Sequence, residues 1–562
     1  MTTENTQHHG VADVDSLSVA EQLRIRPLFG LETEYGVHAP ANPSANHSVL
    51  SMDLVNAYAA RMIGEGSAVA GTEWDYGEES PLVDARGWTM PRSAAHPSQL
   101  TDEPLGPEQI AAEAIAAERA DNRWQDEPTH QLMNLVLTNG ARFYVDHAHP
   151  EYSSPETTTY LSAVKFDQAG EIVLRRASEH LAAEQGAEIR LYKNNTDNKG
   201  VSYGAHENYL LSREVDFDHI VLGLLPFFTS RQVICGAGRV GTGIGNVAPN
   251  FQISQRADFF EEQVGLETTI RRPIVNTRDE PHAWGEKYRR LHVIIGDANL
   301  SQYSTWLRIG TTDLVLGMIC AGWVPAFKLL NPVAALQTIS HDPELNAKVH
   351  CSDRMPRSGL EIQRYYLEEA RTFWLTQELP AARRAEVDEM LDAWEEILND
   401  LATDLFLTAD RLDWVAKYQL VSKVTQRHNI GLGDPKIAMI DLQYADIDSQ
   451  RGLYYKLLAA GRMRTLVSEE DIAAAADHPP SDTRAYLRGN AIRYYSALVS
   501  GVSWETLLLR NPADHRIHRV LMSEPFRGSA DEAADLFGGN VEDEQFIQRA
   551  LSISAGTEKG SF

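Results

Sequence analysis

Four segments of the chain alternate apolar and polar residues in the way that predicts β-strands with one buried face. The clearest is 139–151, where Phe143 and Val145 alternate with polar residues and Glu151 follows just beyond Pro150. The other three segments are 29–36, 203–210 and 289–297. The polar positions of the four strands are Arg142, Tyr144, Asp146, Glu32, Glu34, His206, Asn208, Arg290 and His292. This pattern is typical of antiparallel sheets.

The polar faces of these strands indicate a site for metal and phosphate. Carboxylates and imidazoles on neighbouring strands could converge on divalent cations, and arginines such as Arg142 and Arg290 could hold phosphate oxygens. Mg²⁺ commonly lies between a few carboxylates and nucleotide phosphates. The alternative is four unrelated amphipathic strands with ordinary surface salt bridges. One shared site explains the four polar strand faces better than four independent coincidences.

The remaining periodicity predicts a mixed α+β protein. Helical spacing of apolar residues occurs in 53–62 and 160–185, and strands are expected from 188–193 onward to residue 297. Beyond residue 311 the chain is expected to be mainly helical, with helices at 358–376, 381–403 and 408–427. The predicted organisation is a disordered extension (1–24), a large catalytic domain (25–447) and a small C-terminal domain with a tail (448–562).

A long insertion, residues 64–131, separates two of the predicted site strands. Insertions of this length are usually functional or disordered. Trp74, Tyr76 and Trp88 indicate either docking onto another surface or a small satellite core. A weak helix is expected near 107–120.

Composition narrows the classes of function. The 562 residues are 43% hydrophobic and 23% charged, with no apolar run of about 18 or more residues, so no membrane span is expected. The N-terminus lacks the pattern of a secretory signal, and three widely spaced cysteines fit a reducing cytoplasm, so a cytoplasmic location is expected. The net charge of −28 argues against non-specific binding of nucleic acid. A local basic groove could still bind an acidic partner; its candidate residues are Arg271, Arg272, Arg278, Arg289 and Arg290.

Several long motifs resemble the Dop/PafA family, the enzymes that remove and attach the small modifier Pup in actinobacteria. They lie at 30–36 (Gly-Leu-Glu-Thr-Glu-Tyr-Gly), 139–152, 192–197, 203–210, 276–283 and 288–299. The resemblance extends from Pro27 to Gly528. It implies a glutamine-synthetase-like antiparallel sheet with one polar, metal- and nucleotide-binding face covered by helices, and a small C-terminal domain.

Within this family the chain resembles the depupylase branch more than the ligase branch. The form of 139–152, the insertion at 74–87 and, more weakly, residues 264–269 are similar to that branch. The N-terminal extension and the stretch 96–131 depart from it. The resemblance implies hydrolysis of the isopeptide bond between Pup and substrate lysines, and possible deamidation of a C-terminal glutamine of Pup. The alternatives are an ATP-consuming Pup–protein ligase and a catalytically silent Pup-binding protein.

The resemblance also implies roles for individual residues, with ATP and Mg²⁺ as cofactors and with Pup and pupylated proteins as partners. The expected metal ligands are Glu32, Tyr144, Glu151, His206 and His292. The expected nucleotide contacts are Arg142, Ser154, Asn208, Trp414 and, from its place on a polar strand face, Arg290. Asp146 is the expected catalytic carboxylate, as a nucleophile or as a general base. For Trp414, which falls in a predicted helix, core packing is the alternative.

Overall fold

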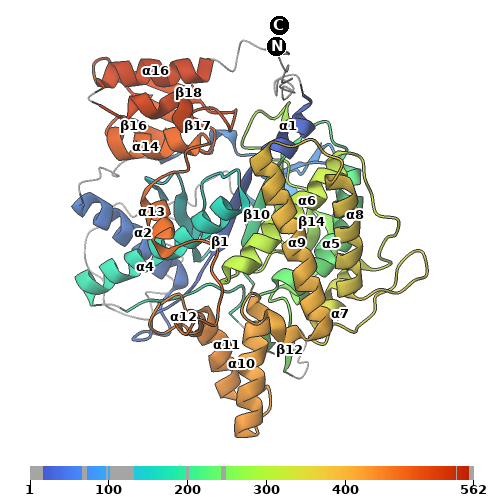
Figure 1. Ribbon diagram of the computed structural model, residues 1–562. Coiled ribbons are helices and arrows are strands. Elements are labelled where there is room, and N and C mark those ends of the chain that lie inside the picture. The colour runs from blue at the N-terminus through green and yellow to red at the C-terminus, as the bar shows by residue number, and fades with distance from the viewer. Residues whose placement is uncertain are drawn as a thin grey trace, which may run out of the picture.

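A six-stranded antiparallel sheet organises the large domain of the computed structural model (Figure 1). The structure describes residues 17–65, 73–96, 99–100, 132–186, 188–197, 202–241, 249–539 and 541–555. The strand order is β15-β10-β1-β8-β7-β6. The strands are β1 (Phe29–Glu34), β6 (Asn134–Val136), β7 (Arg142–Asp146), β8 (His149–Ser153), β10 (Ala205–Ser212) and β15 (Tyr288–Val293). All four predicted site strands therefore belong to one sheet, and the mixed α+β class is confirmed.

Helices cover the apolar face of this sheet. They are α2 (His47–Gly64), α4 (Tyr160–Gln185), α5 (Phe217–Cys235) and α6 (Gln302–Cys320). Phe143 makes an edge contact with Tyr58 of α2 at 6.1 Å between ring centroids, and Leu31 joins the core formed with α5 and α6. The expectation that helices cover the polar face is wrong for these four helices, because the apolar side chains of the strands point toward them.

The segment before β1 is ordered from Ser18, where a capping box begins helix α1 (Val19–Ile25). Leu23 packs with Leu210, and Arg24 donates to Gln377 at 2.7 Å. The predicted disorder of residues 1–24 is therefore wrong from Ser18 onward, whereas residues 1–16 lie outside the described part of the chain.

The later helices follow the predicted periodicity closely. The three predicted helices are α8 (Gly359–Trp374), α9 (Ala381–Thr403) and α10 (Asp413–His428). Helices α7 (Pro332–Ser340) and α11 (Pro435–Ala445) also lie in this mainly helical region but were not predicted individually. Helix α5 was missed, because its region was expected to form strands. Most of its residues are buried, so it lacks the polar stripe that reveals a helix in sequence.

Short strand pairs flank the main sheet. They are β2 (Gly36–His38) with β9 (Arg190–Tyr192), β11 (Arg239–Gly241) with β12 (Asn250–Gln252), and β13 (Phe260–Gly265) with β14 (Arg272–Asn276). The first two pairs are antiparallel and the third is parallel.

The C-terminal unit begins later than predicted. Helices α12 (Leu453–Ala459) and α13 (Glu469–Asp477) pack into the core of the large domain through Tyr454 and Ala475. A separate core forms from α14 onward. Its elements are α14 (Ala485–Tyr495), β16 (Val499–Val502), β17 (Thr506–Arg510), β18 (Ile517–Leu521), α15 (Ala530–Ala533) and α16 (Asp543–Ala555). The boundary predicted at residue 447 is therefore wrong and lies after α13.

The described part of the insertion contacts the C-terminal unit at Trp74, whereas its residues Ser80 and Asp84 bond to Glu280 and Thr277 of the large domain. Strand β3 (Glu73–Trp74) pairs in parallel with β16, and Trp74 contacts Trp504 edge-on at 5.4 Å between centroids. Strands β4 (Val83–Asp84) and β5 (Trp88–Thr89) form a small hairpin. Trp74 therefore packs in a core with the C-terminal unit. This agrees with the satellite-core interpretation of the insertion and not with docking onto another surface. The helix expected near 107–120 lies outside the described residues.

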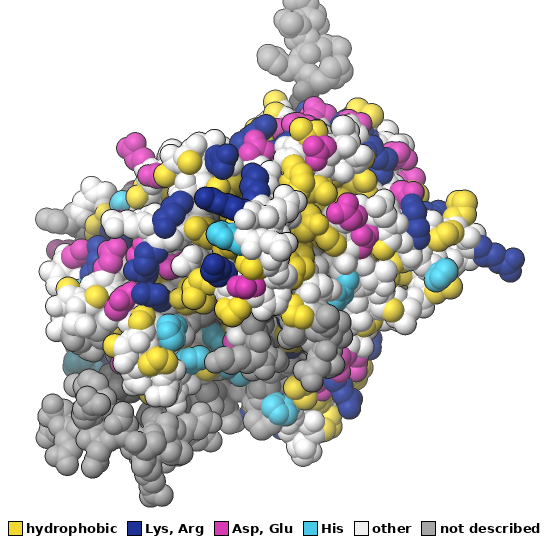
Figure 2. All heavy atoms as spheres, turned by 90° about the horizontal axis from the view of Figure 1, so that it is seen from below, with side chains coloured by type: hydrophobic (Ala, Val, Ile, Leu, Met, Phe, Trp, Pro, Cys, Tyr) yellow, Lys and Arg dark blue, Asp and Glu magenta, His cyan; other side chains and the backbone are white. Residues whose placement is uncertain are grey.

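Among the described residues, no helix combines the length and the apolar character needed to cross a bilayer. Although the net charge is −28, basic side chains gather on part of the face shown in Figure 2, close to histidines and hydrophobic side chains. The net charge therefore does not describe every part of the surface.

Candidate active site

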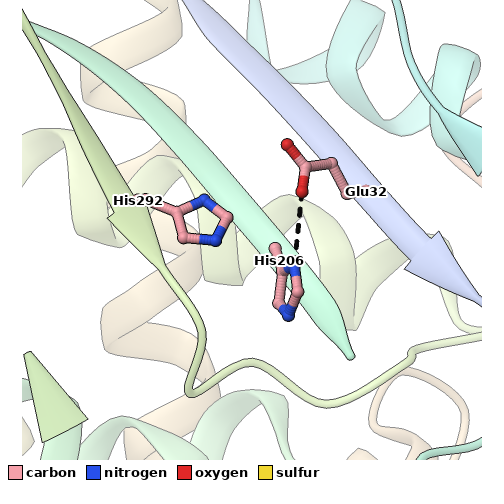
Figure 3. A group of neighbouring side chains, drawn as sticks. All are labelled: Glu32, His206 and His292. Carbon is pink, nitrogen blue, oxygen red and sulfur yellow. Dashed lines mark hydrogen bonds and ion pairs between the residues drawn. The ribbon is translucent and has the colours of Figure 1, made fainter. Parts of the chain in front are cut away.

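Glu32, His206 and His292 converge from three neighbouring strands on the polar face of the sheet (Figure 3). His206 lies directly opposite Glu32 in the β1–β10 register, with His206 Nδ1 3.2 Å from Glu32 Oε2. The two imidazole rings meet edge-on, with 4.9 Å between centroids. One carboxylate and two imidazoles form a donor set suited to a divalent cation.

The electrostatics of this cluster favour ligation. Burial opposes ionisation of Glu32, but the hydrogen bond with His206 and the charge of Arg290 help to hold its pKa well below the ordinary value. Burial and the neighbouring Arg290 lower the pKa of His292 well below its ordinary value. A neutral imidazole beside an ionised carboxylate is the protonation state that metal binding requires.

Glu34, Asp146 and Glu151 form a second cluster, with ligand atoms all within 4.8 Å of one another. Glu34 and Glu151 are direct partners in the β1–β8 register. Glu34 shares the predicted polar face but was not among the predicted ligands. The alternation of Glu32 and Glu34 along β1 was the signal that could have identified it.

The second cluster concentrates negative charge in a buried place. Burial, together with the charges of Asp146, Glu34 and Glu32, raises the pKa of Glu151 well above its ordinary value. Burial also opposes ionisation of Asp146, yet the nearby His147, 3.0 Å away, keeps its pKa below the ordinary value. Carboxylates crowded in this way fit a hard divalent cation, which would neutralise them.

Tyr144 is the direct partner of Glu151 in the β7–β8 register. Burial and the charge of Glu151 raise the pKa of Tyr144 well above its ordinary value, so its side chain is a neutral phenol. The structure therefore brings four of the five predicted metal ligands into the two carboxylate and imidazole clusters and places the fifth beside them.

A pocket that is open to solvent lies next to the Glu32 cluster. The predicted contacts Ser154, Asn208 and Arg290 line it. Its other lining residues include Gly30, Glu32, His282, Arg484 and Trp504. Arg290 Nη1 donates to Asn208 Oδ1 at 2.7 Å, and Arg290 Nη2 lies 3.1 Å from Glu280 Oε2. The pocket therefore offers cationic, amide and aromatic groups together.

Trp414 is not part of this pocket. Its side chain is fully buried in the main core, and its indole N–H donates to the carbonyl of Val233 at 3.0 Å. The predicted nucleotide contact of Trp414 is therefore wrong in this structure, and its core-packing alternative holds. Trp504 supplies the aromatic ring of the pocket instead. The sequence motifs do not include Trp504, because it lies in the C-terminal region beyond all of them.

Arg142 lies under the insertion rather than in the pocket lining. Its guanidinium is 3.9 Å from the ring centroids of both Trp74 and Tyr144, and its Nε donates to Asn134 Oδ1 at 2.8 Å. Glu79 accepts a hydrogen bond from Trp74 Nε1 at 2.7 Å, and burial raises the pKa of Glu79 to about 7. The insertion thus reaches the polar face beside Tyr144.

Comparison with known proteins gives a consistent set of matches. Residues 27–508 match the family described as Pup-ligase protein. A protein of Acidothermus cellulolyticus named depupylase is 46% identical over 91% of this chain and 96% of its own length. A Mycobacterium tuberculosis protein named Pup deamidase/depupylase is 44% identical over 89% of this chain and 94% of its own length. A Pup–protein ligase of Paenarthrobacter aurescens is 40% identical over 77% of this chain and 94% of its own length.

Solved structures match as well. The complex between Pup and its ligase PafA superposes with a TM-score of 0.73 at 28% identity, covering 96% of each chain. The Pup ligase PafA in complex with ADP superposes with a TM-score of 0.66 at 34% identity, covering 83% of this chain and 98% of the other.

Proposed function

The chain belongs to the Pup-ligase protein family, and from this premise we propose that it is a hydrolase that cleaves the isopeptide bond between Pup and substrate lysines. The observation that carries the proposal is the cluster of Glu34, Asp146 and Glu151 beside the cluster of Glu32, His206 and His292. The relatives named for depupylation are more similar than the ligase and match more of this chain. The insertion at 74–87 supports the same branch.

Asp146 is the proposed catalytic carboxylate. Its lowered pKa keeps it ionised at neutral pH, so it has a free electron pair to use. In one route, Asp146 attacks the scissile carbonyl carbon, the carbon–nitrogen bond breaks as the lysine amine takes a proton from water, and a second water then hydrolyses the acyl anhydride, which restores Asp146. In the other route, Asp146 takes a proton from water as the water oxygen attacks the same carbon; the carbon–nitrogen bond then breaks, and Asp146 returns the proton to the leaving lysine amine.

We propose Mg²⁺ and ATP as bound cofactors. Glu32, His206 and His292 would hold one cation, and Glu34 and Glu151 a second, with Tyr144 beside them. Ser154, Asn208, Arg290 and Trp504, which line the pocket, would bind the nucleotide, and Arg142 would remain beside Tyr144 under the insertion. A cation bound there would supply positive charge that stabilises a developing oxyanion. The PafA structure in complex with ADP supports nucleotide binding in this family.

Two finer statements belong to the same proposal. The antiparallel sheet with one polar face supports a glutamine-synthetase-like fold of the carboxylate–amine ligase kind. The side-chain amide of a C-terminal glutamine in Pup contains the same type of bond as the isopeptide, so deamidation of Pup would use the same residues. Pup and pupylated proteins are the proposed partners.

One assay tests this function against its main alternative. The purified chain is incubated with a Pup-conjugated protein, free Pup, ATP and Mg²⁺, and products are separated by mass. Release of free Pup with regeneration of the unmodified protein is expected. Formation of new conjugate with consumption of ATP would contradict the proposal and identify a ligase. Binding of Pup with neither product would identify a binding protein.

A further inference from the structure

Arg488 connects the C-terminal unit to the large domain beside the pocket proposed to bind the nucleotide. It lies in α14, and its side chain is fully buried. Its Nε donates to the Gly140 carbonyl at 3.0 Å, its Nη1 to the Trp504 carbonyl at 3.1 Å, and its Nη2 to Glu156 Oε2 at 2.5 Å. All three guanidinium nitrogens therefore have partners, and the three acceptors belong to separate segments of the chain.

Two glycines let α14 approach the turn before β7 closely enough for these bonds. A Cβ at Gly489 would lie 2.5 Å from the Thr138 carbonyl oxygen, and a Cβ at Gly140 would lie 2.9 Å from the Ala485 carbonyl oxygen. Gly140 also has a φ of 79°, a conformation that favours glycine. Neither distance leaves room for a side chain, so the close backbone contact between the two units depends on both glycines.

Glu156 accepts hydrogen bonds from two arginines of the C-terminal unit. Besides Arg488, Arg484 donates to it through Nε at 2.7 Å, and Arg484 Nη2 donates to the His282 carbonyl at 2.7 Å. Burial opposes ionisation of Glu156, yet Arg488 and Arg484 lower its pKa to about 2. Glu156 follows Ser154 by two residues, and both line the pocket together with Arg484. The ionic contact between the two units is therefore part of the pocket wall.

Trp504 is held in place by two contacts. Arg488 binds its carbonyl, and the Arg488 guanidinium lies 5.0 Å from the centroid of its ring. Trp74 of the insertion meets the same ring edge-on. Trp504 is half-buried and lines the pocket, while Arg488 is not one of the described residues that line it. An effect of Arg488 on a bound nucleotide would therefore pass through the residues that it holds.

The contact between Arg488 and Glu156 is better suited to fixing geometry than to adding stability. Removing two charges from water is costly, and the attraction between the partners does little more than offset that cost. Arg488 Nη1 also lies 3.3 Å from Glu156 Oε1, so the pair is bidentate. A bidentate pair of guanidinium and carboxylate adds directional specificity to its energy. It therefore fixes the position of Trp504 relative to the segment that carries Ser154.

We propose that Arg488, anchored by Glu156, positions the Trp504 ring for contact with the base of the bound nucleotide, and so links nucleotide binding to docking of the C-terminal unit. The inference rests on the proposed function and adds a positioning residue to its nucleotide site. A ring that is already held in place loses less freedom when a base stacks on it, which favours binding. Conversely, a nucleotide that binds only the docked arrangement stabilises that arrangement.

Four proteins test whether Arg488 acts through Trp504: the parent, Arg488→Gln, Trp504→Ala and the double variant. ATP affinity is measured by calorimetry at saturating Mg²⁺. Each single variant is expected to bind ATP roughly 5- to 100-fold more weakly, the range for loss of one contact between a base and an aromatic ring. The double variant should bind about as weakly as Trp504→Ala, because the ring that Arg488 positions is then absent. Additive losses, or unchanged affinity in Arg488→Gln, would overturn the inference.

Cleavage kinetics distinguish positioning from a general loss of structure. In Arg488→Gln, the ATP concentration for half-maximal cleavage should rise by a similar factor, while the rate at saturating ATP stays close to that of the parent. A lower rate at saturating ATP with an unchanged half-maximal concentration would contradict the inference.

Lys287→Gln is the matched control. Lys287 forms another ion pair between the two units, with Glu524 at 2.9 Å, and it should keep the ATP affinity of the parent. An equal loss of affinity in Lys287→Gln would show that any weakening of the contact between the units has this effect, and would refute a specific role for Arg488.

The parent alone provides a test that needs no substitution. Hydrogen exchange of the backbone amides is compared with and without ATP and Mg²⁺. Bound nucleotide should slow exchange in α14 as well as next to Trp504, because Arg488 joins the two. Unchanged exchange in α14 with ATP bound would overturn the link. Failure of the parent to bind ATP at all would instead overturn the proposed cofactor, and the inference with it.

Discussion

Glu34 and Glu151 are direct partners across the β1–β8 ladder, and Asp146 completes a cluster of three carboxylates around them. Like charges directly opposite each other on a sheet are destabilising. The raised pKa of Glu151 is the consequence in the protein without a cation. A cluster of this kind is a place where stability has been given up for binding.

Glu151→Gln should therefore stabilise the metal-free protein at alkaline pH. Since the pKa of Glu151 is raised by folding, its contribution to stability is fully present below the ordinary value of 4.5 and is lost as pH rises through the raised value. Glu151→Gln has no carboxyl group to ionise at this position, so it does not lose this stability as pH rises. Its melting temperature in EDTA at pH 8 should therefore exceed that of the parent. Each unit of pKa shift is worth about 1.4 kcal/mol.

Added Mg²⁺ should reverse the order, raising the melting temperature of the parent more than that of the variant. Glu179→Gln, at an exposed position of α4, serves as the control and should behave like the parent. If Mg²⁺ shifts parent and Glu151→Gln equally, Glu151 does not bind the cation.

Glu32→Ala and His292→Ala should each weaken binding of metal and ATP together, because the cation and the phosphates would share ligands. Calorimetric titration of ATP at limiting and at saturating Mg²⁺ measures the coupling. A loss of nucleotide affinity of roughly 10-fold or more is expected for each variant at limiting Mg²⁺. Unchanged affinity would count against a shared site.

Trp504→Ala should lower nucleotide affinity, whereas Trp414→Phe should lower stability. Trp504 lines the pocket, and stacking of a base on an aromatic ring is worth about 1–3 kcal/mol. Trp414 is fully buried and hydrogen-bonded to Val233, so its replacement leaves space and an unpaired carbonyl in the core. Fluorescent-nucleotide binding and thermal unfolding separate the two effects. If Trp414→Phe lowers nucleotide affinity and Trp504→Ala does not, Trp414 is the nucleotide contact.

Deletion of residues 74–87 should reduce stability as well as alter cleavage. The deletion removes Trp74 from the core of the C-terminal unit and uncovers Arg142. Thermal unfolding and the rate of cleavage at several ATP concentrations measure the two consequences. The single change Trp88→Ala, at an exposed position of the same segment, is the control for stability. A deletion that leaves both stability and kinetics unchanged would show that the insertion has no role in either.

Sequence periodicity predicted the parts of the fold that have one polar and one apolar side. The site strands and helices such as α4 and α9 were found for this reason. Helix α5 was not, because burial on nearly all sides removes the polar stripe. The limit between the domains was also placed too early, since α12 and α13 are amphipathic segments whose packing partner is not encoded locally.

In the candidate site, too, the sequence predicted what depends on local geometry and missed what depends on tertiary packing. Alternation along single strands identified Glu32, Asp146, His206 and His292, because facing directions follow from local geometry. The grouping of Glu34 with Asp146 and Glu151 depends on the register between strands, which local sequence does not specify. Trp504 lines the pocket in place of Trp414 because of the way the C-terminal unit packs against the large domain. This tertiary contact leaves no local pattern in the sequence.

Asp146→Asn tests most directly whether Asp146 performs the cleavage. The change keeps the size of the side chain and removes its nucleophilicity and basicity. We expect release of free Pup from a Pup-conjugated protein to fall to below about 1% of the parent rate, as loss of acid–base catalysis alone costs roughly 100-fold or more. Binding of ATP and of the conjugate should stay close to the parent values. Cleavage at more than a few per cent of the parent rate, with binding intact, would contradict the account.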